Sequence, residues 1–280
     1  QGENGVAIGN SAGRNSQAIN SVAIGVNAGN ETQGVSSVAI GNQAGYNIQG
    51  NNTIAVGQNA GRILQSLYGV SMGRNAGSNR QGSSSVAIGV NAGCNLQTNN
   101  SVAIGNLAAR ANQDTDCVAI GKQAGSNNQG QYGIAIGLTA GKVNQDVGGI
   151  AIGVNAGQTD QQRGSVAVGA SSGQTTQGLY SVAIGRWAAK LYQKEYAVAI
   201  GQEAGSNLQN DRAIAIGSNA GANSQGIEAI AIGNRAGYNS QKPQSVAIGH
   251  YAGSNSQNFF ATAVGVQAGA INQGESAVAI

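Results

Sequence analysis

The chain repeats itself every sixteen residues. The Gly that closes the sequence Val-Ala-Ile-Gly recurs from Gly9 to Gly265 without insertion or deletion. A fixed period of this kind is typical of solenoids, in which each repeat stacks on the one before it. The period therefore predicts a single continuous repeat array over residues 1–280. Because the chain opens and closes within a repeat, we interpret it as a segment of a longer fibrous protein.

Equivalent positions of the repeats differ sharply in how much they vary. One column holds Gln in every copy, and another holds the Gly of Val-Ala-Ile-Gly in every copy. The position after that Gly, by contrast, holds Asn10, Val26, Lys122, Arg186 and His250 in different copies. Duplication alone leaves all columns equally alike, so the invariant columns indicate positions at which the fold tolerates one residue type.

The repeat unit favours short β-strands. In residues 21–25, which read Ser-Val-Ala-Ile-Gly, the large Val and Ile alternate with Ser, Ala and Gly, as they would on the two faces of a strand. β-Branched residues favour strands, and frequent Gly disfavours helices. We predict a second strand that runs from the later Ala-Gly pair to the Gln. The fold class is then an all-β parallel β-solenoid or β-roll of about 17 rungs, with two short strands in each sixteen-residue rung.

The alternation defines one face of large side chains and one face of small ones. We expect Val and Ile to fill the inside, and the Ser, Ala and Gly columns to form a smooth outer strip that packs against identical chains. A homotrimer or a bundled filament is the expected assembly. The Ala residues of the expected self-association strip are Ala7, Ala23, Ala39, Ala55, Ala87, Ala103, Ala119, Ala135, Ala151, Ala167, Ala183, Ala199, Ala215, Ala231, Ala247 and Ala263.

The invariant Gln column is expected to be structural. Its amides either stack in a ladder, each bonded to the amides above and below, or bond the backbone at each corner. The residues of this column include Gln17, Gln33, Gln49, Gln65, Gln81, Gln97, Gln113, Gln129, Gln145, Gln161, Gln177, Gln193, Gln209, Gln225, Gln241, Gln257 and Gln273.

Charge is sparse in this chain. Charged residues make up 9% of the sequence, and the net charge of +3 is spread along it without a run of Lys or Arg. Such a distribution does not predict binding to nucleic acid or to an anionic membrane surface. No apolar run approaches the length of about 18–20 residues that a membrane span requires, so we expect no membrane contact within this segment.

Chemistry-bearing residues are few and scattered. His250 lies in a variable column and is expected at the surface, while Asp114 and Asp116 form a close acidic pair that a turn explains. Cys94 and Cys117 lie in different columns, so a disulfide between them is not expected. We therefore predict no catalytic, cofactor-binding or metal-binding residues, no cofactor, and no enzymatic activity.

One variable column collects aromatic residues. Tyr68, Tyr132, Tyr180 and Tyr196 share it with Phe260, just before the small-residue strip. These side chains could pack over a turn, bind sugar rings or contact a neighbouring chain. Three sequences of the form Asn-x-Ser/Thr begin at Asn30, Asn51 and Asn99, and they matter only if the source glycosylates its secreted proteins.

The repeats resemble those of a known family. The copies SVAIGVNAG at 21–29, SVAIGNQAG at 37–45 and SVAIGHYAG at 245–253 are similar to the head-domain repeats of trimeric autotransporter adhesins. The resemblance implies a left-handed parallel β-roll, three chains side by side, and display on a bacterial surface where matrix and host molecules are bound. The sixteen-residue period is longer than the usual repeat of that family, so a phage or viral tail-fibre segment stays an alternative.

Three classes of function compete. We expect an extracellular structural or adhesive fibre, at a cell or virion surface, that binds itself and possible host, matrix or glycan ligands. An ice-binding solenoid is the second hypothesis, because regular ladders can order water, although its outer array would be expected to be rich in Thr. A polysaccharide-cleaving enzyme on a β-helix is the third, and it would require irregular loops and clustered acids that the strict period does not provide.

Overall fold

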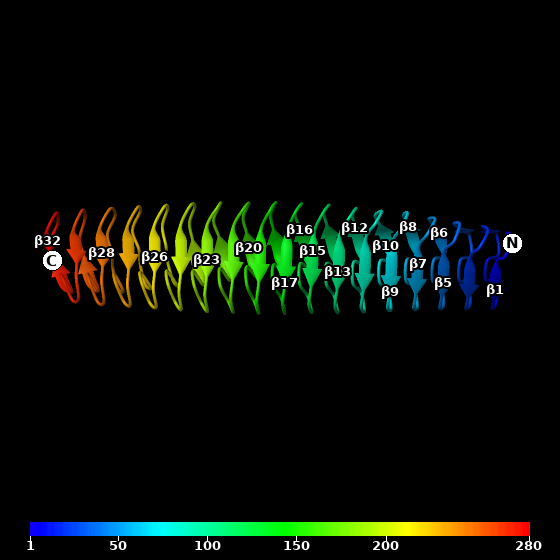
Figure 1. The fold of residues 1–280 in the computed structure, drawn as a ribbon, viewed down its shortest axis with the longest axis horizontal. Coiled ribbons are helices and arrows are strands. Elements are labelled where there is room, and N and C mark those ends of the chain that lie inside the picture. Colours follow the sequence, from blue (N-terminus) through cyan, green and yellow to red (C-terminus); the bar gives the residue numbers. More distant parts are fainter. The chain divides into compact units, whose positions relative to one another are not determined.

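A computed structural model describes residues 1–280 and shows an all-β parallel solenoid, which confirms the predicted fold class. The chain forms two compact units, Gln1–Val143 and Asn144–Ile280. In each unit, strands of successive rungs pair in parallel with residues sixteen positions apart, as in Val22↔Val38 and Ile150↔Val166 (Figure 1). No helix with the length and apolarity of a membrane span is present.

The first unit contains two parallel sheets. The first sheet is built from the Val-Ala-Ile segments and the second from the segments that end at Gln. Strands of the first sheet are β1 (Val6–Ile8), β3 (Val22–Ile24), β5 (Val38–Ile40), β7 (Ile54–Val56), β9 (Val70–Met72), β11 (Val86–Ile88), β13 (Val102–Ile104), β15 (Val118–Ile120) and β17 (Ile134–Ile136). Strands of the second sheet are β2 (Ser16–Gln17), β4 (Thr32–Gln33), β6 (Asn47–Gln49), β8 (Ile63–Gln65), β10 (Asn79–Gln81), β12 (Asn95–Gln97), β14 (Ala111–Gln113) and β16 (Asn127–Gln129).

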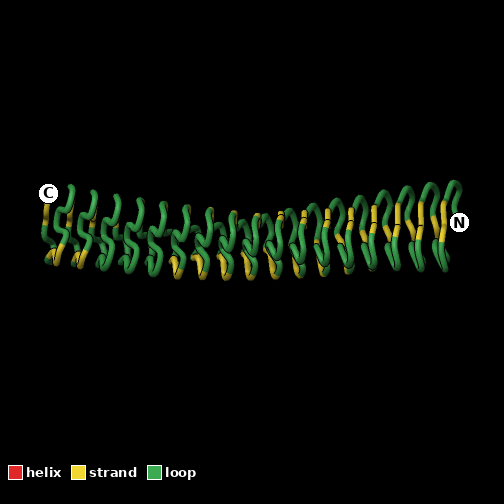
Figure 2. Tube along the Cα trace, turned by 90° about the horizontal axis from the view of Figure 1, so that it is seen from below, coloured by secondary structure: helices red, strands yellow, loops and turns green.

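The second unit repeats this plan after β18 (Val143–Gln145), which contains the boundary. Its first sheet consists of β19 (Ile150–Ile152), β21 (Val166–Val168), β23 (Val182–Ile184), β25 (Val198–Ile200), β26 (Ile214–Ile216), β27 (Ile230–Ile232), β28 (Val246–Ile248), β30 (Thr262–Val264) and β32 (Val278–Ala279). Its second sheet consists of β20 (Thr159–Gln161), β22 (Thr175–Gln177), β24 (Leu191–Gln193), β29 (Asn255–Gln257) and β31 (Ile271–Gln273). Between β24 and β29, isolated bridges through Gln209, Gln225 and Gln241 replace full strands (Figure 2).

Two turns complete each rung. We call the segment equivalent to residues 25–30 the AG turn, because it contains the Ala-Gly pair, and the segment equivalent to residues 34–36 the Gln turn. The second strand is shorter than predicted, since Ala28 and Gly29 lie in the AG turn and β4 begins only at Thr32. Gly29 has a φ of +51°, a left-handed conformation that is incompatible with a strand at this residue.

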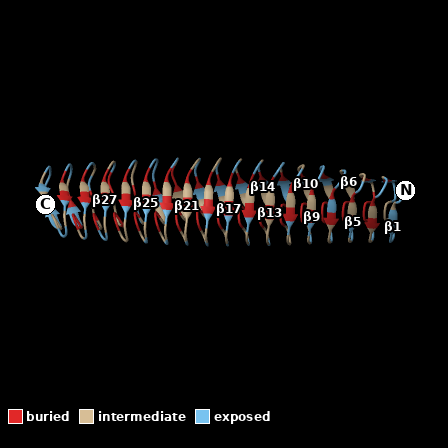
Figure 3. Cartoon of the chain, in the orientation of Figure 1, coloured by how far each residue is buried: buried red, intermediate tan, exposed pale blue.

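The prediction about the two faces was wrong in direction. The alternation is present, but the small residues in the middle of the first-sheet strands are buried, whereas the Val and Ile residues on either side of them are half-buried or exposed (Figure 3). Ala7 is exposed in the first rung; the other Ala residues of the expected self-association strip have no exposed surface in the single chain and therefore cannot contact another one. These buried residues are Ala23, Ala39, Ala55, Ala87, Ala103, Ala119, Ala135, Ala151, Ala167, Ala183, Ala199, Ala215, Ala231, Ala247 and Ala263.

The interior is too narrow for two layers of branched aliphatic side chains. In a representative rung, Ala23, Ala28, Gln33 and Ser37 together fill the space between the sheets, and each is at most 1% exposed. The long Gln side chain crosses from the second sheet, and the AG turn closes against the first strand. A Cβ placed on Gly29 would come within 3.4 Å of the Ala23 Cβ, which shows how closely the two walls approach. Val22 and Ile24 are consequently displaced to the outer face.

Candidate binding surfaces

The invariant Gln side chains lie inside the solenoid and combine both of the roles considered from sequence. Gln97 Nε2 donates to the backbone carbonyls of Val86 and Ser101, at 3.0 and 3.2 Å, and so joins the two sheets. It also donates to Oε1 of Gln113 at 3.0 Å, which extends a side-chain ladder along the unit. Buried polar groups require such partners, so the Gln column stabilises the fold from inside the solenoid.

The ladder is interrupted at a few positions. In the first unit, the Oε1 atoms of Gln17, Gln33 and Gln49 are buried without a hydrogen-bond partner. In the second unit, the Oε1 atom of Gln241 is also buried without a partner. The Nε2 atoms of these residues still donate to backbone carbonyls, as Gln33 does to Val22 at 2.7 Å. The corner bonds to the backbone are thus the more regular part of the pattern.

The outer surface of the first sheet is apolar in both units. In the first unit, the outer column contains Ile40, Met72, Ile88, Ile120 and Ile136, which are 36–42% exposed. In the second unit, the equivalent column contains Ile152, Ile184, Ile200, Ile216, Ile232, Ile248 and Val264, which are 36–39% exposed. The half-buried Val and Ile residues two positions earlier form a parallel column beside it. We call these two columns the Val/Ile face.

The Val/Ile face is unusual for a surface that is exposed to solvent. Large contiguous apolar patches generally mark sites that bind another molecule. Sequence reasoning missed this face because it assigned the large aliphatic side chains to a core. The signal that could have found it is the Gln column, since a long polar side chain invariant in every rung needs interior space and carbonyl partners.

The two cysteines are free and lie in different environments. Cys94 is half-buried in an AG turn, and its Sγ lies 3.3 Å from Oγ of Ser78. Cys117 occupies the inward column that holds Ser in many other rungs, and its Sγ contacts the carbonyl oxygen of Gly130 at 3.0 Å. Burial raises the pKa of the Cys117 thiol to about 11, and the nearby charge of Asp114 contributes in the same direction.

The other chemistry-bearing residues do not converge. His250 is exposed and packs edge-on against Tyr251, with ring centroids 4.4 Å apart. Asp114 and Asp116 flank a Gln turn, where Oδ1 of Asp114 accepts a hydrogen bond from the Thr115 amide at 2.7 Å and Oδ1 of Asp116 accepts one from Asn100 at 3.1 Å. Across residues 1–280, no group of three or more His, Cys, Asp or Glu residues is placed to hold a metal ion.

The aromatic column lies at the Gln turns. Each of its members has a positive φ, between 52° and 61°, and is at least half exposed: Tyr68, Tyr132, Tyr180, Tyr196 and Phe260. In the second unit, the rings of Tyr180 and Tyr196 stack with centroids 5.7 Å apart. The column therefore packs partly on itself and keeps ring surface open to solvent.

The AG turns of the second unit carry aromatic rings next to cations. The guanidinium of Arg186 lies 3.7 Å from the ring centre of Trp187, and Nζ of Lys190 lies 5.8 Å from the same ring. Farther along, Arg235 lies 5.3 Å from the ring of Tyr251 and donates a hydrogen bond to its hydroxyl group at 2.6 Å. Cation–π contacts of this kind hold long side chains in place on an exposed surface.

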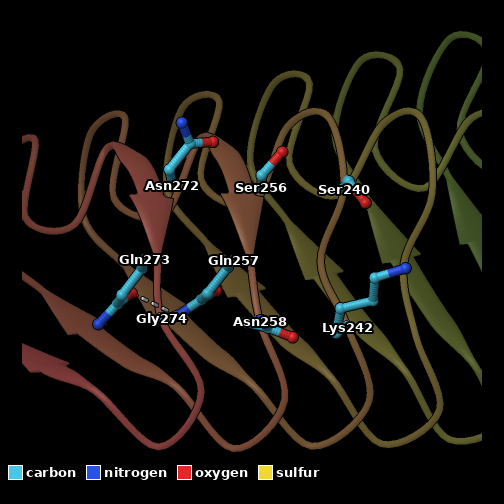
Figure 4. Close-up of a pocket in the computed structure, with 8 residues that line it drawn as sticks. All are labelled: Ser240, Lys242, Ser256, Gln257, Asn258, Asn272, Gln273 and Gly274. Carbon is cyan, nitrogen blue, oxygen red and sulfur yellow. Dashed lines mark hydrogen bonds between the residues drawn. The ribbon is translucent and has the colours of Figure 1, made fainter.

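A polar groove lies over the second sheet near the C-terminal end of the second unit (Figure 4). Its volume is about 410 Å³, and Lys242 is its one charged side chain. Gln257 and Gln273 are joined in it by a hydrogen bond of 3.2 Å, whereas the remaining lining is Ser, Asn and Gly. With no acid, thiol or imidazole in its lining, the groove lacks the set of unlike groups that catalysis requires.

Comparison with protein families gives one match, which covers part of the second unit. The family model described as the YadA head domain repeat matches two overlapping copies, at residues 193–220 and 209–236, both within the second unit. A comparison with curated protein sequences gave no match. The matched residues contain β25 and β26 and include residues of the invariant Gln and Gly columns. These two columns also recur in all the remaining rungs of the chain.

Proposed function

We propose that this chain, whose repeats are head-domain repeats of the kind found in trimeric autotransporter adhesins, is a structural and adhesive segment of an extracellular fibre in which copies associate through the Val/Ile face. The observation that carries the proposal is the recurrence of exposed large aliphatic side chains along this face in both units. The family match supports an adhesive fibre at a cell surface. The regular solenoid supports a structural role, because every rung repeats the same backbone hydrogen bonds.

The energetics favour association through this face. Each exposed Ile still presents somewhat more than a third of its surface to water, as Ile88 and Ile120 do. Covering that remainder is worth about 0.5–1 kcal/mol per side chain. Because a second copy has the same sixteen-residue period, its Val and Ile side chains meet equivalent ones at every rung. Many small contributions therefore add along the contact.

The family favours three copies rather than two. Three chains placed side by side direct their Val/Ile faces toward a common axis and leave the AG turns and Gln turns on the outside. In this arrangement, the chains contact one another through the Val/Ile face, whose columns vary least among the outward-facing positions. Ligand binding then falls to the variable turn residues, such as those at 10 and 14 in the first rung.

The test is the mass of the full chain in solution, measured by light scattering. We expect three times 27.7 kDa for the unaltered chain. The double variant Ile88→Lys, Ile120→Lys places charge on the Val/Ile face and is expected to give the mass of one chain. The matched control Leu64→Lys, Leu96→Lys changes residues of similar exposure, 38% and 40%, on the second sheet and is expected to keep the larger mass.

Two outcomes would contradict the proposal. One is a monomeric unaltered chain, and the other is equal behaviour of the face variant and its control. A stable monomer would leave two registered columns of aliphatic side chains exposed to water, and ice-crystal shaping would then be measured, because regular arrays are the hallmark of ice-binding solenoids.

A further inference from the structure

The solenoid sorts the charges of the chain onto its turns. Nine of the 14 Lys and Arg residues lie in AG turns, and the one acidic residue in any AG turn is Glu203 of the second unit. The cations of the AG turns are Arg14, Arg62, Arg74, Arg110, Lys122 and Lys142 in the first unit and Arg186, Lys190 and Arg235 in the second. Most acids lie in the Gln turns, namely Glu3, Asp114, Asp116, Asp146, Glu195, Asp211, Glu228 and Glu275.

This sorting gathers cations that form no run in the sequence. They are far apart in sequence, but they fall at two positions of the sixteen-residue period, both within the AG turn, and stacking places equal positions of successive rungs side by side. Arg62, Arg74, Arg110, Lys122 and Lys142 fall within six successive AG turns of the first unit. We call these five residues the basic edge.

Backbone hydrogen bonds hold the basic edge as a row. The amide of Asn91 donates to the carbonyl of Arg74 at 2.9 Å, and the amide of Thr139 donates to that of Lys122 at 2.9 Å, so each AG turn is bonded to the next. At a rise of about 4.8 Å per rung, the row from Arg62 to Lys142 extends over about 24 Å. The edge thus presents close to one cation per rung on a fixed backbone.

The basic edge carries uncompensated charge. None of its five residues lies in an ion pair; the ion pair of the chain joins Arg212 and Glu228 at the Gln turns. Arg74, Arg110 and Lys122 are exposed, whereas Arg62 and Lys142 are half-buried. A row of like charges repels itself, and an extended anion laid along it would offset that repulsion.

The neighbouring side chains indicate the chemical class of the anion. Beside the cations, the amides of Asn59, Asn75 and Asn91 form a ladder with hydrogen bonds of 3.0 and 2.9 Å, and such amides can bind hydroxyl groups. No aromatic side chain lies in these six AG turns to stack a nucleobase. Duplex DNA carries a charge about every 1.7 Å, far more densely than one cation per rung.

We propose that the basic edge binds a linear sulfated polysaccharide that lies along the AG turns of the first unit. The sulfate groups pair with the Arg and Lys side chains, and the sugar hydroxyl groups meet the Asn ladder. This inference rests on the adhesive function proposed above and names a ligand class for it. The contacts are spread over several rungs, so binding is weakened by salt.

The experiment measures binding of fluorescein-labelled heparin to the full chain by anisotropy at several NaCl concentrations. The edge variant carries Arg62→Gln, Arg74→Gln, Arg110→Gln, Lys122→Gln and Lys142→Gln. The control variant carries the same number of neutralisations outside the AG turns: Arg80→Gln, Arg163→Gln, Lys194→Gln, Arg212→Gln and Lys242→Gln. Both variants lower the formal net charge from +3 by the same amount.

We expect the edge variant to bind heparin at least about tenfold more weakly than the unaltered chain, and the control variant to stay within about twofold. Equal weakening of both variants would show that net charge alone attracts heparin and would overturn the proposal. Absence of heparin binding by the unaltered chain, or tighter binding of duplex DNA than of heparin, would also overturn it. Far-UV circular dichroism confirms that each variant is folded.

A second readout separates this proposal from the proposed assembly. Cys94 lies in the AG turn between those of Arg74 and Arg110, so a fluorophore attached to it in a Cys117→Ser background reports ligand at the edge itself. The mass of every variant is measured in parallel. If the edge variant loses heparin binding but keeps its mass, the result supports the basic edge as the binding site. If the unaltered chain is a monomer and still binds heparin through the edge, the result contradicts only the proposed assembly.

Discussion

At the scale of single residues, Cys117 shows how little the interior of a rung tolerates. Its side chain has no exposed surface and stands where Ser101 and Ser85 stand in neighbouring rungs. Burial disfavours the thiolate, which raises the pKa of the thiol from an ordinary value of 9.0 to about 11. The unfolded chain therefore ionises this thiol first as the pH rises.

The stability of the chain is expected to fall between pH 9 and pH 11 because of Cys117. The stabilising contribution is complete below the pKa of the unfolded thiol and is lost as the pH rises through about 11. The loss is up to about 2–3 kcal/mol. Urea unfolding at pH 8 and pH 10.5 measures it as the difference between the unaltered chain and Cys117→Ser. Cys94→Ser serves as the control, and its free energy of unfolding should fall between the two pH values as that of the unaltered chain does. An equal fall in all three proteins would contradict the prediction.

At this scale, the sequence indicates which positions are structural, but it does not indicate whether their side chains point into the rung or out of it. That a Gln invariant in every rung is structural follows from the repeat alone. That it points inward does not, because a Gln is more often exposed than buried. Its burial depends on two carbonyl partners, Val86 and Ser101 in the case of Gln97, which only the folded rung brings within reach.

At the scale of elements, the Gln ladder and the first sheet stabilise one another. The Gln column bonds the carbonyl of the Val before each buried Ala, so it links the second sheet to the first in every rung. The strands are only two or three residues long, and such strands are not stable on their own. The side-chain bonds therefore replace part of what a thicker apolar core supplies elsewhere.

Replacement of Gln97 by Met is expected to destabilise the chain by about 2–4 kcal/mol, because a side chain of similar size cannot donate the buried hydrogen bonds that the Gln97 amide makes to the carbonyls of Val86 and Ser101 and to Oε1 of Gln113. Gln58 lies exposed in an AG turn, and Gln58→Met, the matched control, should change stability by less than about 0.5 kcal/mol. Urea unfolding of both variants measures the difference. Similar midpoints for the two variants would show that the Gln97 amide does not stabilise the fold.

The second strand illustrates the limits of pattern reading for elements. The alternation of large and small side chains located the Val-Ala-Ile strands correctly, because it continues at every second residue across the segment. The Ala-Gly pair was wrongly included in the second strand. Residues 27 and 29 both have positive φ, so the chain turns there rather than extending, and Asn27 gives no sequence signal as clear as that of Gly29.

At the scale of the whole molecule, the period makes each unit a stack in which a rung contacts its two neighbours. Registers of sixteen residues recur from strand to strand, as in Val86↔Val102 and Val102↔Val118. Nearest-neighbour stacking predicts that a whole rung can be removed if the phase is kept. It also predicts that half a rung cannot be removed, because first-sheet strands would then face second-sheet strands.

Deletion of residues 85–100 joins Ser84 to Ser101 and is expected to keep the β-sheet circular dichroism and to shift the melting temperature by less than about 5 °C. Deletion of residues 85–92, which removes half a rung, is expected to abolish cooperative melting. Circular dichroism between 20 and 90 °C distinguishes the two. A cooperative transition in the half-rung deletion would show that the strands can change register.

What the sequence by itself determined is the period, and with it the parallel in-register stacking, the two short strands per rung and the list of positions that tolerate no change. What only the tertiary structure decided is which side of each strand is inside. The alternation of large and small side chains is the same whichever face of the strand lies inside. Val22 and Ala23 are therefore equally good candidates for the core until the width of the rung is known. The Gln side chain and the close approach of the AG turn set that width, and they leave room only for a small side chain such as that of Ala23. The same folding gathers Arg62, Arg110 and Lys142 onto one edge, because residues that are distant along the chain are brought together when equal phases of the repeat are stacked.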